Sequence, residues 1–150
     1  YWLQKIGTPE YATWSGYSFE TVCLHHIDQI VNALGISGTF YSPCSWTYRP
    51  SKAVLKDVDA DEDMKTGGQI DLLIDRNDKT VSVCEMKYAN GLFEITKEYE
   101  AKLINKLDVL QRETATRKSL MLTLVTSYGV KPNVHAGIVQ AEVLIDDLFE

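Results

Sequence analysis

Apolar residues recur at spacings of three and four in two long stretches, and each stretch predicts a helix. The first runs from Phe19 to Leu34 and is expected to end at Gly35. The second lies within residues 95–118, where leucines share one side and charged residues surround the rest. Both stripes need an apolar surface to pack against, which predicts a layered domain.

The chain before Phe19 predicts a separate, shorter helix. Thr8 is suited to cap it, Pro9 to occupy its first turn, and Glu10 to face the positive end of its dipole. Gly16 is expected to interrupt this helix before the longer one begins.

Five other stretches have the composition of β-strands. Residues 39–48 are rich in aromatic and β-branched residues, with a bend expected near Pro43. Residues 68–75 and 80–88 form a strand pair, 119–126 is a nearly continuous apolar run, and 141–145 gives a last strand. This order predicts an α/β sandwich with a mixed central sheet flanked by helices.

The composition predicts a single domain whose net charge does not favour binding to a polyanion such as nucleic acid. The 150 residues are 45% hydrophobic, which suits a single core, and the net charge of -6 opposes nucleic-acid binding. The sequence contains no run of about 18 apolar residues, so it predicts no membrane-spanning helix. Three cysteines, an odd number without a secretory leader, favour a reduced, cytoplasmic setting. Because the chain begins with Tyr1, we expect it to be a piece of a longer protein.

Three charged residues interrupt the apolar strand pair. Asp71 lies in the first strand, and Glu85 and Lys87 lie in the second. Charges among Ile, Leu and Val cost desolvation free energy unless they meet partners or a cation. Because side chains two apart on a strand share a face, Glu85 and Lys87 point the same way.

The length of the turn decides whether Asp71 joins them. A two-residue turn, Asn77–Asp78, would place Asp71 opposite Cys84 and send its carboxylate to the other face. A three-residue turn ending at Lys79 would place Asp71 opposite Glu85, with Cβ atoms about 5 Å apart. Carboxylates that close suit a shared proton or Mg²⁺, so a metal site here requires an odd turn.

Asp71, followed by Glu85-Met86-Lys87 on the next strand, resembles the PD-(D/E)xK nuclease superfamily, which has the restriction-endonuclease-like fold. The resemblance covers most of residues 16–147 and implies the element order α-β-β-β-α-β-(β). The superfamily's usual proline before the Asp is replaced by Ile70.

The resemblance also implies roles for individual residues. Asp71 and Glu85 would hold Mg²⁺ or Mn²⁺, and the backbone carbonyl of Met86 and the first-helix Glu20 would complete the metal shell. Lys87 would assist the attacking water. All four side chains are thereby catalytic candidates.

A narrower resemblance concerns residues 8–20, the Gly-x-Gln-Ile-Asp-Leu-Leu-Ile run at 67–74 and the ending at 144–149. These segments look like the C-terminal domain of bacterial and archaeal AAA-type ATPases of unassigned role. The resemblance implies a linker or short helix at residues 1–15 and a nuclease-like domain at 16–150. The ATP-binding domain, an expected partner, would lie in a missing N-terminal part, since this chain contains no Gly-x-x-x-x-Gly-Lys-Ser/Thr sequence.

Each candidate also has a purely structural interpretation. Asp71, Glu85 and Lys87 could form a buried salt bridge on the sheet, and Glu20 could be a solvent-facing helix acid. Gln69 and Lys97 could contact substrate or be ordinary polar residues. A basic track for DNA competes with an ordinary charged helix face at five positions: Lys102, Lys106, Arg112, Arg117 and Lys118.

Together these observations predict a metal-dependent hydrolase that cleaves phosphodiester bonds of nucleic acid, with DNA as the expected substrate. The alternative is a non-catalytic module that docks DNA or a protein beside an ATPase. The acidic net charge favours the alternative, and the intact Asp, Glu and Lys favour catalysis.

Overall fold

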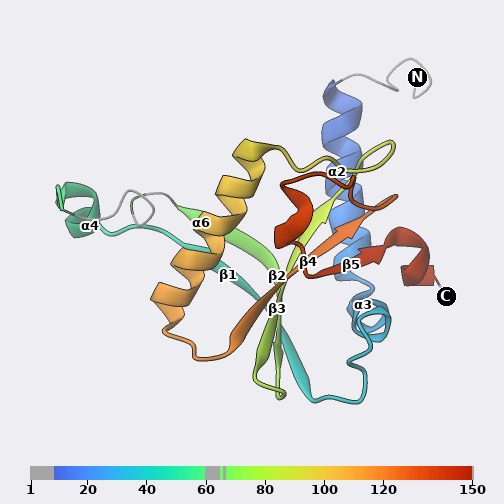
Figure 1. Cartoon of the computed structure of the whole chain (residues 1–150), viewed down its shortest axis with the longest axis horizontal. Coiled ribbons are helices and arrows are strands. Elements are labelled where there is room, and N and C mark those ends of the chain that lie inside the picture. Colours follow the sequence, from blue (N-terminus) through green and yellow to red (C-terminus); the bar gives the residue numbers. More distant parts are fainter. Residues whose placement is uncertain (1–8, 60–64, 66, 150) are drawn as a thin grey trace.

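The computed structural model describes residues 9–59, 65 and 67–149, with side chains from residue 16 onward (Figure 1). Its elements in chain order are α2 (Pro9–Leu24), α3 (Ile27–Ala33), β1 (Tyr41–Tyr48), α4 (Lys52–Lys56), β2 (Gly68–Arg76), β3 (Thr80–Lys87), α6 (Lys97–Thr114), β4 (Ser119–Thr126), the 3-10 turn η1 (Ala136–Ile138), β5 (Ala141–Leu144) and the 3-10 turn η2 (Ile145–Phe149). The expected cap Thr8 lies outside the described residues.

The five strands form one mixed sheet in the order β1-β2-β3-β4-β5. β1, β2 and β3 pair antiparallel, while β3, β4 and β5 pair parallel. A parallel connection needs a crossover, and α6 supplies it between β3 and β4. The predicted α/β class with a mixed sheet is therefore confirmed.

Helices cover both faces of the sheet. On one face, Phe19 and Cys23 of α2 and Ile30 of α3 pack against Leu72 and Cys84 of the strands. On the other face, α6 packs its leucines against alternate residues of β3 and β4 (Figure 1). This alternation is what sends Glu85 and Lys87 toward α6 and their neighbours toward α2.

The prediction that Gly16 interrupts the first helix is wrong. α2 runs from Pro9 to Leu24 through Gly16, and the break falls at His25 and His26. At that break the backbone N–H of His26 donates to Cys23, while its ring Nδ1 lies 2.7 Å from the Val22 oxygen. The His26 imidazole thus contacts the Val22 carbonyl oxygen, which would accept a backbone hydrogen bond if the helix continued. This contact ends α2.

The end of α3 follows the prediction. Gly35 has a φ of 73°, and its N–H donates to the Asn32 oxygen while the N–H of Ile36 donates to the Val31 oxygen. This pair of hydrogen bonds is the Schellman ending, in which glycine avoids the strain of a left-handed backbone.

Other elements lie close to their predicted ranges. The sequence predicts a bend of β1 near Pro43, and the structure has a register shift between Cys44 and Trp46. Pro43 itself is tolerated because β1 is an edge strand. α6 begins after its cap Thr96 and ends at Ala115, inside the expected 95–118. None of the helices among the described residues is long and apolar enough to cross a membrane.

Candidate functional site

The turn between β2 and β3 has the odd length that a shared site requires. Residues 77–79 connect the strands, and Lys79, with a φ of 66°, supplies the left-handed residue that closes a three-residue turn. The strands pair from Leu72–Cys84 to Asp75–Val81. This is the register expected of an odd turn, and the paired residues end one residue before Asp71 and Glu85, whose direct pairing stays a prediction.

Asp71 and Glu85 lie where the two strands part. Within the described sheet, the pairing of β2 with β3 ends at Leu72–Cys84. Beyond that pair, β2 continues along β1, and β3 continues along β4. The fork leaves space for side chains between the strands instead of a closed ladder.

A hollow of roughly 640 Å³ occupies this fork. It brings together six residues predicted for the site and one that the sequence suggested only for a DNA track, Lys106: Glu20, Gln69, Asp71, Glu85, Met86, Lys87 and Lys106. α2, β2, β3 and α6 all contribute to its wall, so segments far apart in the sequence meet here. Lys97 does not line it, because this lysine lies exposed in the first turn of α6.

Glu85 is the most buried acid of the hollow. Its exposure is 8%, and its Oε1 accepts a hydrogen bond from Nζ of Lys106 at 2.9 Å. A carboxylate this buried needs a cation or several donors, so the lysine from α6 compensates its charge.

Asp71 is held from its own strand. Gln69, two residues earlier in β2, donates from Nε2 to Oδ1 of Asp71 at 2.8 Å. This bond fixes the direction of the carboxylate. Gln69 therefore supports Asp71, in addition to lining the hollow.

Glu20 is coupled electrostatically to both strand acids. Partial burial and then the charge of Asp71 raise its pKa, with a further contribution from Glu85, while Lys87 and Lys106 oppose the shift. Glu20 lines the hollow and is half-buried, which departs from the alternative of a fully solvated helix acid. Three carboxylates and two lysines thus share one electrostatic environment.

Lys87 is positioned by an aromatic ring. Its Nζ lies 5.1 Å from the centre of the Tyr99 ring on α6, a distance suited to a cation–π contact. Burial, and to a smaller degree the charge of Glu85, raises the pKa of Tyr99. The Tyr99 hydroxyl is buried and has no hydrogen-bond partner among the described residues.

Cys84 lines the hollow without offering a nucleophile. Burial raises the pKa of its thiol, like that of Cys23, to about 12. Both stay protonated near neutral pH, as expected of small residues packed in a core. Covalent chemistry by Cys84 is therefore disfavoured.

Sequence reasoning did not assign Lys106 to this site. Its position carries the necessary signal, because Leu103, Lys106, Leu107 and Leu110 follow the spacing of one helix face. A lysine inside an apolar stripe is carried toward the sheet. The sequence does not show that this lysine pairs with Glu85, because that pairing depends on how α6 crosses β3.

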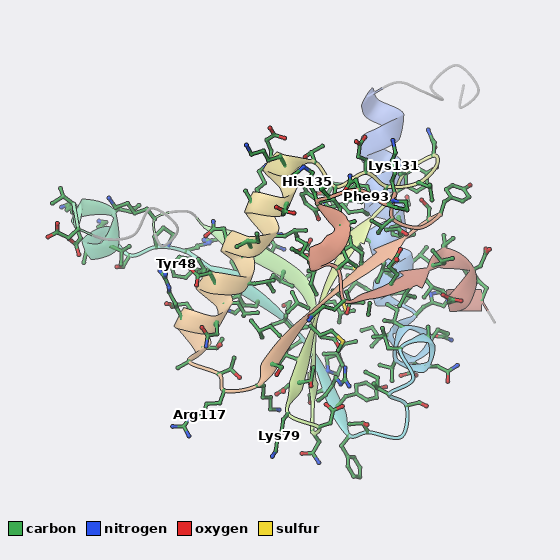
Figure 2. All side chains as sticks on the ribbon, viewed as in Figure 1. Tyr48, Lys79, Phe93, Arg117, Lys131 and His135 are labelled. Atoms are coloured by element: carbon green, nitrogen blue, oxygen red, sulfur yellow. The ribbon has the colours of Figure 1, made fainter. Side chains whose placement is uncertain are left out.

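The remaining cations of the expected DNA track are largely paired or distant. Arg112 contacts Asp108 at 3.0 Å, and Lys118 contacts Asp75. Arg117 points outward near Lys79, at the end of the molecule where the hairpin turns (Figure 2). Lys102 is exposed on α6 and is not among the residues that line the hollow.

The hollow offers ligands suited to a hard divalent cation. Among the described residues, no three His, Cys, Asp or Glu side chains are grouped so that they could hold a metal together. Mg²⁺ is commonly held by one or two carboxylates, with waters and phosphates as its other ligands. The hydrogen bonds to Asp71 and Glu85 within the described part of the chain use one oxygen each, Oδ1 and Oε1. Carboxylate oxygens are hard ligands, so this donor set fits Mg²⁺.

Comparison with known proteins adds no relative to this description. The chain matches no family model, no curated protein and no solved structure. The resemblance to PD-(D/E)xK nucleases and to the ATPase-linked domain thus stays a prediction from the residues themselves.

Proposed function

We propose that this domain hydrolyses phosphodiester bonds of nucleic acid, with DNA as the expected substrate, in the hollow between α2, β2, β3 and α6. The observation that carries the proposal is the convergence of three carboxylates and two lysines from four elements. A structural ion pair needs only one residue of each sign. An excess of charge in a concave site favours binding and chemistry over structure.

Two strand acids would hold the metal in this proposal. Asp71 and Glu85 supply hard oxygens, and the Met86 carbonyl and Glu20 would extend the shell. When bound, Mg²⁺ or Mn²⁺ supplies Lewis acidity at the phosphoryl oxygen and lowers the pKa of a bound water.

The chain's own residues supply the remaining chemistry. Lys87, its ammonium resting on the Tyr99 ring, would orient the attacking water and offset negative charge on the phosphoryl group. The raised pKa of Glu20 brings its carboxyl group closer to the range in which it exchanges protons near neutral pH.

The proposal extends to fold and context. The helix, three strands, helix, strand and further strand follow the order expected of a restriction-endonuclease-like domain, apart from the added α3 and α4. We propose that the domain accompanies an AAA-type ATPase domain, as the resemblance of residues 8–20 implies.

Cleavage assays on matched variants test this function. With Mg²⁺ or Mn²⁺ and single- or double-stranded DNA and RNA, Asp71→Ala and Lys87→Ala should each lower the rate by about 100-fold or more, because each removes a group acting at the reacting phosphate. Asp59→Ala and Lys131→Ala remove the same charges from exposed positions outside the hollow and should leave the rate unchanged. Absence of metal-dependent cleavage by the parent, or equal rates in the parent, Asp71→Ala and Lys87→Ala, would overturn the proposal.

A second candidate is a docking module for DNA or protein beside the ATPase. The pairing of Lys106, Arg112 and Lys118 with acids favours its protein-docking form, since both cleavage and docking of DNA need free cations to attract phosphate. Calorimetric titration with metal separates the two. Binding that Glu85→Gln abolishes supports the nuclease, whereas no binding at millimolar metal supports docking.

A further inference from the structure

α6 carries a lysine into the inner wall of the hollow. Lys106 lies in the same helical stripe as Leu103 and Leu110, both of which are buried against the sheet. Its side chain is 29% exposed and that of Glu85 is 10% exposed, and their charged atoms are 2.9 Å apart. The pair is therefore largely shielded from water.

This ion pair occupies a carboxylate that the proposed metal needs. Glu85 is too buried to remain without a positive partner, and either an ammonium or a divalent cation would satisfy it. Both cations at the same carboxylate would repel each other across a few ångströms in a poorly hydrated site. Withdrawal of one cation when the other binds relieves this repulsion.

The two lysines of the hollow differ in this respect. Lys106 contacts Glu85 directly, whereas Lys87 rests on the Tyr99 ring. Lys106 has a flexible four-carbon stem and borders an open hollow into which its ammonium can turn.

We propose that Lys106 is an exchangeable counter-cation: it neutralises Glu85 in the metal-free protein and is displaced when a divalent cation binds that carboxylate. This inference rests on the proposed metal site and adds the residue that competes for it. Metal binding is then an exchange of cations at Glu85. The apparent metal affinity therefore depends on the strength of the Lys106–Glu85 ion pair as well as on the ligands of the metal.

The exchange makes a prediction opposite to that for an ordinary site residue. When the binding-competent state is only partly populated, the apparent dissociation constant is raised by that fraction. If Lys106 holds Glu85 for about nine-tenths of the time, Lys106→Met should tighten metal binding about tenfold. Removing a residue that supported the metal would weaken binding instead.

Calorimetric titration of the metal-free chain with Mn²⁺ tests the exchange. Lys106→Met is compared with two other lysines changed to Met. Lys87→Met removes a charge that lines the hollow without touching Glu85, and Lys102→Met removes an exposed charge from the same helix. Only Lys106→Met should bind Mn²⁺ about tenfold more tightly, and Glu85→Gln should not bind it.

Thermal unfolding gives a readout that does not depend on catalysis. In EDTA, Lys106→Met leaves Glu85 buried without its cation, so it should unfold at a lower temperature than the parent. Mn²⁺ should restore more stability to Lys106→Met than it adds to the parent, because tighter binding to the folded state stabilises more. Lys106→Gln, which keeps a donor to Glu85, provides a second variant if Lys106→Met does not fold.

The outcomes separate this inference from the proposed function. Unchanged or weaker Mn²⁺ binding in Lys106→Met, with binding still lost in Glu85→Gln, overturns the exchange and leaves the metal site intact. An equal gain in Lys87→Met also overturns it, since general charge repulsion would then explain the effect. No Mn²⁺ binding by the parent or by any lysine variant overturns the proposed function itself.

Discussion

Glu85 and Asp71 both line the hollow where β2 and β3 part, and each is held by a different kind of partner. Glu85 receives a full positive charge from Lys106, whereas Asp71 receives a neutral amide donor from Gln69. Among the described residues, Lys106 and Gln69 each contact one oxygen of these carboxylates, and the further ligand in our proposal is a divalent cation.

The raised pKa of Glu20 makes the free energy of unfolding depend on pH. Because its pKa is raised above its ordinary value of 4.5, the folded chain holds the proton to higher pH than the unfolded chain does. The unfolding free energy therefore falls as pH rises from about 4.5 through the higher folded-state pKa.

Glu20→Gln should remove this loss. Its stability in EDTA should match that of the parent below pH 4.5 and exceed it at pH 7, by less than about 1 kcal/mol because much of the side chain is exposed to water. Urea unfolding at the two pH values measures the difference. A parent that is more stable than Glu20→Gln at pH 7 would show that Glu20 is held by a favourable partner instead.

At the residue scale, the sequence predicted the acids better than the cations around them. Asp71, Glu85 and Lys87 stood out because charge in an apolar strand demands a partner. Glu20 and Lys106 needed the crossing of two helices over the sheet before their proximity to Glu85 was visible. Side-chain pairs between sequence-distant elements depend on packing angles that local patterns do not specify.

At the element scale, two glycines show why a helix break was misplaced. Gly16 lies inside α2 without a positive φ, and an added Cβ would meet no atom within 4 Å. Gly35 also has open space, but its φ of 73° follows the end of α3. The sequence shows the same residue in both places, whereas the backbone requires glycine only in the second.

The same substitution should therefore have opposite effects at these positions. Gly16→Ala should stabilise the chain by about 1 kcal/mol through helix propensity, and Gly35→Ala should destabilise it by about 1 kcal/mol through left-handed strain. Urea denaturation midpoints compare the two. Equal signs would contradict the assignment of Gly16 to the interior of a continuous helix.

The strands were easier to predict than the helix ends. β4 begins and ends at the predicted residues 119 and 126, because an uninterrupted apolar run needs cover on both faces. The register of β2 and β3 followed from the length of the turn at residues 77–79. The break at His26 depended on a side-chain hydrogen bond to Val22, which no periodicity reports.

At the scale of the whole molecule, a net charge of -6 is difficult to reconcile with unaided nucleic-acid binding. The hollow gathers three of the carboxylates that make up this charge, and Lys106 beside them already has an acidic partner. A divalent cation at Asp71 and Glu85 would both reduce the negative charge and free Lys106 for phosphate. In our account, metal binding precedes productive contact with the substrate.

The most direct test of the metal site is a crystal structure of the domain soaked in Mn²⁺, with anomalous scattering used to locate the ion. The account predicts one strong peak in the fork of β2 and β3, about 2.1 Å from an oxygen of Asp71 and an oxygen of Glu85, with the Lys106 ammonium withdrawn from Glu85. No peak at millimolar Mn²⁺, with Lys106 still bound to Glu85, would contradict it.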